Sequence, residues 1–388
     1  MKKRAALNLA AIFFISTPGF LQSGTFTLGP SVELRHRGTL RNVLTTSRTL
    51  ELLGPSQHYI FDIQRFRSDW LVSFKGAFRL AAVYDHELRM GDYLETPEYA
   101  LFKSIEPVEM VNLDTRIIDR KEFNWRHRLY RLFAEWDKYP LRITLGRQQI
   151  SWGTGYFWNP TDLFNPVTFA LVERDERHGV DAVSLELSLG TLSQLHIVWA
   201  PADDPHLGRG AVRLKTNLKE YDFSVMGGWI FRDRVIGADF SGAIRGAGFR
   251  GEWLHNFAYM REAYDQAVLG VDYHFKWNLT FSGEYLYNSG ALSPVEILAA
   301  FSRSQAGSVI SVSRHLGGFY ADYQVHPLVH VSGYLGVDLD QGGAFFGPRI
   351  SWNILTNLDL EAGALIGTGE GEFGLSENAC YLTTSWYF

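Results

Sequence analysis

Charged residues recur at alternate positions within apolar segments of this chain, the spacing at which side chains share one face of a β-strand. Arginines dominate this pattern in the first half of the chain and acids dominate it in the second half. If these faces line an aqueous lumen, one wall is basic and the other acidic, and the transverse field orients polar solutes. The alternative is that the charges pair between neighbouring strands. The candidates for lining the lumen are Arg131, Arg142, Arg147, Asp272, Glu284, Asp338 and Asp359.

Arg147 departs from the alternation of its own segment. Counting from Leu141 through Leu145, strict alternation turns Arg147 to the same side as these leucines. In a membrane barrel, an unpaired arginine facing lipid at the midplane costs about 2 to 4 kcal/mol. We therefore predict a β-bulge at Gly146 that returns Arg147 to the polar side.

The segment from Trp152 to His178 is the second candidate for function. It contains two Asn-Pro pairs, which initiate turns, set among aromatic residues, so we expect a compact loop. One interpretation is that this loop folds into a barrel mouth and narrows it. The other is that it covers the rim or forms a subunit contact. The candidate constriction residues are Trp152, Trp158, Asn159, Pro160, Asp162, Asn165 and Pro166.

Motifs for other chemistries fail on their context. Gly369 to Gly374 fits G-x-G-x-x-G, but a further strand follows it, so no helix N-terminus is present to bind a pyrophosphate. The histidines are scattered, and Cys380 is the single cysteine. We therefore expect no catalytic site, cofactor or metal. The net charge of -5 also gives no reason to expect nucleic-acid binding.

The elements that carry these residues are predicted to be many short strands. From Trp277 to Tyr287 apolar and polar residues alternate, with aromatic residues at the two ends, as in the interfacial girdles of membrane barrels. Aromatic residues make up 14% of the chain, and 37 glycines suit tight turns. The predicted strands number 18, with 16 as the alternative, at 25–36, 58–72, 76–88, 123–137, 141–151, 179–189, 192–201, 209–217, 220–231, 234–243, 246–256, 264–274, 277–288, 313–324, 328–338, 344–352, 356–367 and 378–388.

The lengths of the connections predict a direction for the barrel. With the N-terminus in the periplasm, the long connections at 37–57, 89–122, 152–178 and 289–312 all fall on the outer side, and we expect the turns of two to five residues on the other side. Outer-membrane barrels have this asymmetry. The fold class predicted is therefore all-β, a single closed antiparallel transmembrane barrel spanning 25–388.

The N-terminal residues are typical of a bacterial signal peptide. Met1 to Arg4 is basic, and Ala5 to Ser16 is apolar but too short to span a bilayer. We place the signal peptide at 1–24. Export together with the predicted barrel implies contact with outer-membrane lipid.

The last strand carries a recognisable signature. It ends in Phe388, with Trp386 on the same face, and it resembles the signal by which the barrel-assembly machinery recognises outer-membrane proteins. The segment from Leu145 through Trp158 to Pro166 also resembles bacterial porin-like families, including alginate-export-type barrels. The resemblance implies a Gram-negative outer-membrane location and a porin-like fold, but no particular substrate.

Two functions follow from these expectations. The leading hypothesis is a passive channel for small hydrophilic solutes, which needs no cofactor. The alternative is a scaffold that sheathes a partner such as a multihaem cytochrome, whose haems belong to the partner. An enzyme is disfavoured, because no nucleophile, base and orienting group form a motif. The chain alone leaves open whether it forms a homo-oligomer.

Overall fold

The computed structural model describes residues 23–49, 55–104, 108–165, 179–293, 296, 308–374 and 378–388. The strands of its first half are β1 (Gly24–Gly29), β2 (Val32–Arg48), β3 (His58–Phe74), β4 (Phe78–Gly91), β5 (Asp114–Asp119), β6 (Phe123–Lys138), β7 (Leu141–Gln148), β8 (Val180–Ser188), β9 (Gln194–Ala200) and β10 (Arg209–Leu218). Those of its second half are β11 (Tyr221–Ile230), β12 (Asp233–Ile244), β13 (Ala247–Phe257), β14 (Tyr264–His274), β15 (Leu279–Asn288), β16 (His315–His326), β17 (Val329–Asp338), β18 (Ala344–Leu355), β19 (Leu358–Thr368) and β20 (Ala379–Tyr387). Short helical turns are η3 (Asp92–Glu95), α2 (Pro97–Ser104) and η4 (Pro205–Leu207).

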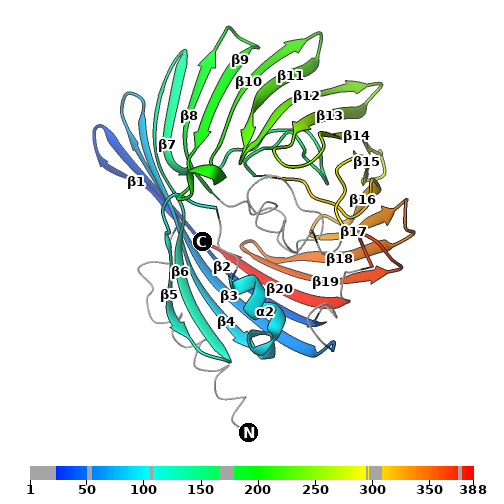
Figure 1. The fold of residues 1–388 in the computed structure, drawn as a ribbon. Coiled ribbons are helices and arrows are strands. Elements are labelled where there is room, and N and C mark those ends of the chain that lie inside the picture. Colours follow the sequence, from blue (N-terminus) through cyan, green and yellow to red (C-terminus); the bar gives the residue numbers. More distant parts are fainter. Residues whose placement is uncertain are drawn as a thin grey trace.

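The strands form one closed barrel of 18 antiparallel strands (Figure 1). The ring closes because β2 pairs with β3 along one edge and with β20 along the other. Two short strands lie outside the ring count: β1 pairs with the first residues of β2, and β5 pairs with the first residues of β6. The predicted all-β barrel is confirmed, and the alternative of 16 strands is wrong.

The connections differ between the two ends of the barrel. We call the end with the connections 75–77, 139–140, 189–193, 219–220, 245–246, 275–278, 327–328 and 356–357 the turn end, and the opposite end the loop end. The long connections all lie at the loop end, as predicted. Two short ones, 231–232 and 339–343, lie there as well, so the expectation that every short turn lies at the other end is wrong. At 231–232, Phe231 adopts a positive φ of 57°, which closes the hairpin in two residues.

The first predicted strand, 25–36, is also wrong in its bounds. The chain turns after Gly29, where Pro30 offers no backbone N–H to a strand ladder, and the barrel strand β2 runs from Val32 to Arg48. Most of the connection expected at 37–57 is therefore strand. Residues 1–22, which make up almost all of the predicted signal peptide, lie outside the described residues. Within the described residues, no helix is long and apolar enough to span a membrane.

The C-terminal residues close the seam of the barrel. The backbone of Phe388 exchanges two hydrogen bonds with Gly38 on β2, at 2.7 and 3.0 Å. A side chain on Gly38 has no room, because a Cβ there would lie 2.0 Å from the Phe388 ring. The same ring stacks against Phe66, with centroids 6.2 Å apart. Trp386, by contrast, is exposed on the outward face of β20.

Deleting Phe388 is expected to reduce the fraction of barrel that folds, because it removes both backbone hydrogen bonds at the seam, each worth about 1 kcal/mol, and the ring that covers Gly38. The folded fraction is measured by heat-modifiability on gels. Phe388→Leu is the matched control, because it keeps the backbone bonds, and we expect it to lie between the wild type and the deletion. An unchanged folded fraction in the deletion contradicts the prediction.

Candidate functional site in the barrel lumen

The connection from β7 to β8 enters the barrel. Its described part, 149–165, is packed against inward-facing side chains of the wall. Ile150, Trp152, Leu163 and Phe164 contribute to an apolar cluster with residues of β8 to β13. Phe157 and Trp158 contribute to a second apolar cluster with residues of β14 to β18. We call 149–165 the internal loop; of the candidate residues in this region, Pro166 lies outside the described residues.

One buried carboxylate, Glu252 on β13, binds the first part of the internal loop. It accepts hydrogen bonds from the backbone N–H groups of Thr154, Gly155 and Thr161, the last two at 2.6 and 3.0 Å. The Thr161 hydroxyl donates to it at 2.7 Å and the Asn159 amide at 3.3 Å. A carboxylate accepts several donors at once, and bonds to a charged group are worth about 1.5 to 3 kcal/mol each.

A second buried carboxylate, Glu284 on β15, binds the next three residues of the internal loop. It accepts the backbone N–H groups of Tyr156, Phe157 and Trp158, at 2.6, 2.9 and 2.9 Å. Arg250 lies 3.4 Å from the same carboxylate. Glu284 was predicted to line open lumen. The structure instead places it beneath the internal loop, with its oxygens occupied by loop amides.

Glycines allow the loop backbone to reach these carboxylates. A Cβ on Gly153, where φ is 78°, would lie 2.6 Å from a Glu252 oxygen, and a Cβ on Gly155 would lie 1.9 Å from the Trp158 carbonyl oxygen. The role of Glu252 was not predicted. The signal for it in the sequence is Gly153-Thr-Gly155, whose exposed N–H groups form an anion-binding turn.

The other candidate loop residues stabilise the loop internally. Asp162 accepts the backbone N–H groups of Phe164 and Asn165, at 3.2 and 2.8 Å, and Asn165 accepts that of Ile150 at 3.1 Å. The Trp152 indole donates to His196 on β9 at 3.0 Å. Pro160 is buried in the same loop. These contacts make the internal loop a packed element of the lumen wall.

The inner face of β3, β4 and β6 carries a network of ion pairs. Arg65 pairs with Glu87 at 2.9 Å and Arg67 with Asp85 at 2.5 Å, in each case between neighbouring strands. Glu87 also binds Arg89 at 2.5 Å. Arg126 and Arg128 share Asp114, on β5, at 3.2 and 2.9 Å. These acids belong to the wall that was predicted to be basic.

Of the candidate arginines, Arg142 is balanced in the same way, and Arg131 lies beside an aromatic ring. Arg142 pairs with Asp137 at 2.7 Å and with Glu186 at 3.1 Å. Arg131 follows a bulge at Tyr130 that turns both side chains inward, and its guanidinium lies 5.9 Å from the Tyr130 ring. The alternative weighed from the sequence, pairing between neighbouring strands, therefore describes this wall better than a separation of charge across the lumen.

The bulge predicted at Gly146 is wrong. Pairing of β7 with β6 and with β8 runs through Gly146 without a register shift, and Arg147 keeps the outward parity of Leu145. Arg147 is nevertheless only 2% exposed, because the segment Glu109–Val111 covers it. It binds Asp181 at 2.8 Å, Glu109 at 3.0 Å and the Val111 carbonyl at 2.6 Å. Burial in this ion-pair cluster removes the cost of a lipid-facing arginine.

The remaining acidic candidates also have local partners. Asp272 pairs with Arg250 on the neighbouring strand, and Asp359 accepts a hydrogen bond from Asn353 at 2.6 Å. Asp338, at the loop end of β17, accepts the Ser313 hydroxyl at 2.5 Å and the backbone N–H of Glu372 at 2.8 Å. Asp338 thereby ties together three connections of the loop end.

A cavity of 420 Å³ remains between the internal loop and the wall of β3 to β6. Six cationic side chains line it against two acids. Aromatic rings from α2 and its neighbours form part of its surface. In the described part of the chain, no group of three His, Cys, Asp or Glu residues has the arrangement of a metal site. The charged residues at the cavity are Arg89, Lys103, Arg116, Arg126, Arg128, Arg209, Glu109 and Asp114.

Glu372 lies in the connection between β19 and β20, next to Asp338. It accepts the backbone N–H of Val312 at 2.5 Å. Burial raises the pKa of Glu372 to about 7, and the neighbouring Asp338 carboxylate adds to the rise. Glu372 therefore binds a proton at a higher pH than an exposed glutamate does.

Glu252→Gln and Glu284→Gln are expected to loosen the internal loop, because a side-chain amide presents its own N–H groups to the loop N–H groups. We expect each to lower the free energy of unfolding by about 2 to 4 kcal/mol and to speed hydrogen exchange of the amides of 154–161. Thermal unfolding and hydrogen exchange measure these effects. Asp359→Asn is the matched control, because its carboxylate binds Asn353 and not the loop. Unchanged exchange in both Gln variants contradicts the role assigned to the carboxylates.

The packing of 308–314 against 369–374 is expected to weaken as the pH rises. The folded-state pKa of Glu372 is above its ordinary value of 4.5, so the stabilisation is complete below about 4.5 and is lost as the pH rises through about 7. Hydrogen exchange of these segments between pH 5 and 8, corrected for intrinsic rates, measures it. Glu372→Gln is expected to abolish the pH dependence of the exchange. Glu370 is an exposed neighbour, so Glu370→Gln is expected to retain it. The same dependence in both variants contradicts the assignment.

Comparison with known proteins gives the architecture a context. No family model matches the chain, and no curated protein matches it by sequence. Among solved structures, OccK11 (OpdR) of Pseudomonas aeruginosa matches with a TM-score of 0.57 at 11% identity, over 95% of this chain and 98% of that one. OprD of Pseudomonas aeruginosa matches with a TM-score of 0.57 at 10% identity, over 95% and 97%.

OccAB3 of Acinetobacter baumannii matches with a TM-score of 0.55 at 11% identity, over 92% of this chain and 99% of that one. At these identities the likeness concerns the fold. It extends over nearly the whole of both chains, so it covers the complete ring of strands. The chain therefore has the fold of the porin-like outer-membrane barrels, with 18 strands.

Proposed function

We propose that this protein is an outer-membrane channel for the passive diffusion of small hydrophilic solutes. The observation that carries the proposal is a closed barrel whose interior holds an anchored loop and, beside it, a polar cavity. Solutes pass between the internal loop and the wall of β3 to β6, where guanidinium and carboxylate groups replace part of their hydration. The likeness to OprD and the Occ barrels supports this function. The proposal requires no catalytic residue.

The position of the internal loop favours a channel over a sheath. A barrel that encloses a partner protein needs a free interior of protein size. Here two apolar clusters fix the loop against the inner faces of β8 to β18, and Glu252 and Glu284 bind its backbone. The space beside the loop suits small solutes.

Orientation follows from the same geometry. In this proposal the turn end faces the periplasm and the loop end faces outward, as in other outer-membrane barrels. The cavity then lies towards the outer mouth, and its excess of cationic groups favours the entry of anions over cations.

The direct test is single-channel recording of the purified protein in planar bilayers. We expect discrete, ohmic openings, and block of part of the current when a permeating solute is added. Folded protein, verified by heat-modifiability, that gives no conductance contradicts the channel.

Lys103→Ala with Arg116→Ala is expected to shift the reversal potential in a salt gradient towards cation preference. Both side chains line the cavity, and their removal leaves Asp119, which binds Lys103 at 2.5 Å, without its partner. The shift is expected to be largest at low salt, where the screening length is about 30 Å at 0.01 M. Arg234→Ala is the control, because Arg234 shares the outward face of β12 with Ile236. An equal reversal potential in the wild type and the double variant contradicts this role.

A further inference from the structure

Most of the outer surface of the barrel is suited to lipid. Along β8 to β20, the outward positions in the middle of the strands are apolar or small. Val225 on β11, Leu269 on β14 and Ile350 on β18 are examples, with 57%, 60% and 47% of the side chain exposed. The outward polar pair His255 and Asp265 lies near the loop end of β13 and β14.

The outward face of β2 and β3 is different, because it carries a cluster of polar groups. Asp62 shares the outward parity of Ile60, which is 48% exposed. The Asn42 amide donates to Asp62 at 2.5 Å, and the Gln64 amide donates to it at 3.3 Å. We call Asn42, Asp62 and Gln64 the acidic cluster.

A second outward cluster lies beside it on β4 and β6. The Tyr84 hydroxyl and His127 Nδ1 are 2.5 Å apart, and the His86 and His127 rings stack with centroids 6.0 Å apart. His86 pairs with His127 across the two strands. The next outward residues of β6 are Leu129, which is half-buried, and Leu132, which is exposed. We call Tyr84, His86 and His127 the histidine cluster.

Apolar residues border the acidic cluster on the outward face of the wall. Ile60 and Phe66 are its outward neighbours along β3. In the pairing register, Leu44 on β2 and Met90 on β4 lie opposite Asp62 on its two sides. Acyl chains offer no hydrogen bonds to a carboxylate or an amide, so lipid is a poor neighbour for this part of the wall.

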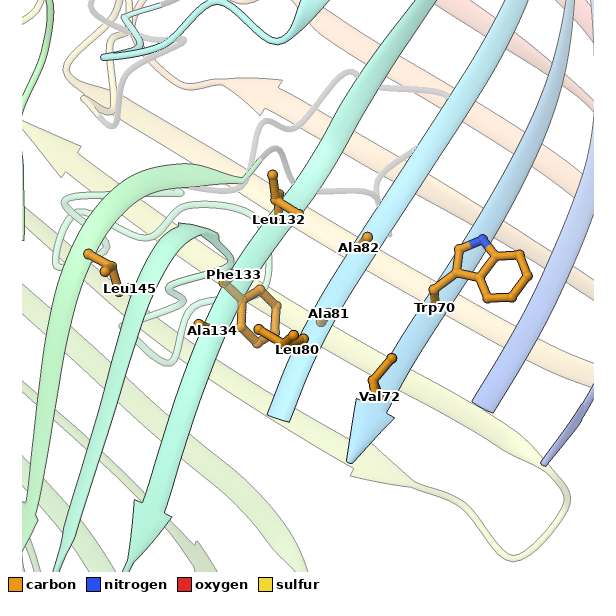
Figure 2. Close-up of a pocket in the computed structure, with 9 residues that line it drawn as sticks. All are labelled: Trp70, Val72, Leu80, Ala81, Ala82, Leu132, Phe133, Ala134 and Leu145. Atoms are coloured by element: carbon orange, nitrogen blue, oxygen red, sulfur yellow. The ribbon is translucent and has the colours of Figure 1, made fainter. Parts of the chain in front are cut away.

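The same wall has an apolar hollow of 330 Å³ (Figure 2). In the pairing register it lies on the turn-end side of the two clusters. Ala82 and Ala134 form its shallow floor, and larger side chains surround them. Small residues let another protein surface approach closely in a membrane. The larger outward side chains labelled in Figure 2 are Trp70, Val72, Leu80, Leu132 and Leu145.

We propose that the outward wall of β2, β3, β4 and β6 binds a second copy of this chain, related by a two-fold axis parallel to the barrel axis. The acidic cluster lies on one side of the line between β3 and β4, and the histidine cluster lies on the other. A two-fold rotation about that line brings the acidic cluster of each copy against the histidine cluster of the other, so the contact forms twice.

The chemistry of the two clusters is complementary in this arrangement. Asp62 supplies acceptor oxygens, and the imidazole and phenol groups of the histidine cluster supply donors. The occupant is a second copy because one chain carries both halves of the contact, on the two sides of the same axis. The inference rests on the membrane location that is part of the proposed function, but not on solute passage.

The test is the oligomeric state of the full protein in lipid nanodiscs, from light scattering coupled to size-exclusion chromatography. We expect the wild type to be a dimer. Two variants are expected to be monomers. One combines Asn42→Leu, Asp62→Leu and Gln64→Leu, and the other combines His86→Leu and His127→Leu. Heat-modifiability verifies that each variant barrel is folded. His255→Leu with Asp265→Leu, the matched outward pair on β13 and β14, is expected to remain dimeric.

A cross-linking experiment locates the axis independently of these variants. Leu88 lies opposite Gln64 between β3 and β4, near the proposed axis. In a Cys380→Ser background, Leu88→Cys is expected to form a disulfide between copies, and Leu269→Cys on the distant wall is not.

A folded wild type that is monomeric, with or without bound lipid, overturns the proposal, as does a dimer that both sets of Leu variants leave intact. Conductance is recorded separately, so a monomeric channel refutes the dimer alone and a silent dimer refutes the channel alone.

Discussion

Hydrogen bonds from the internal loop to two buried carboxylates are the interaction on which the lumen depends. Glu252 and Glu284 lie on strands of the wall, and both carboxylates accept backbone N–H groups of 154–161. A loop inside a barrel leaves backbone donors that no strand ladder satisfies, and an unpaired buried N–H is costly. The carboxylates meet this need, and the amides in turn stabilise the charge of the carboxylates. These hydrogen bonds fix the position of the loop, and the position of the loop sets the shape of the cavity beside it.

The apolar clusters around the loop depend on the same anchoring. Once the N–H groups of 156–158 are bound to Glu284, the Phe157 and Trp158 side chains reach Val268, Leu286 and Leu316 on the inner face of the wall. Inward-facing apolar residues are unusual in a water-filled barrel, whose interior is generally polar. Here the loop covers them, so one part of the interior is a protein core, and a polar cavity remains beside it.

Charge on the barrel wall is balanced over short distances. Arg65, Arg67 and Arg142 each have an acid on a neighbouring strand, and Arg147 is enclosed by Asp181 and Glu109. Cross-strand partners lie about 5 Å apart, whereas opposite walls of a barrel of this size are much farther apart, so local pairing has the larger Coulomb energy. The excess of cationic groups remains at the cavity, where side chains of α2 and β5 join those of the wall.

The sequence by itself determined the class of fold and the placing of the long connections at one end, and it left 18 or 16 strands open. Alternation is a local property with a period of two residues, so it is readable wherever one face of a strand meets lipid. The tertiary structure decided which groups meet. The contact of Glu252 with Gly155 joins residues 97 positions apart, and it exists only because the barrel closes and the loop turns inward. The same reason applies to Arg147. The bulge predicted to turn it inward is absent, because its cover, Glu109–Val111, comes from a distant segment that no local period encodes.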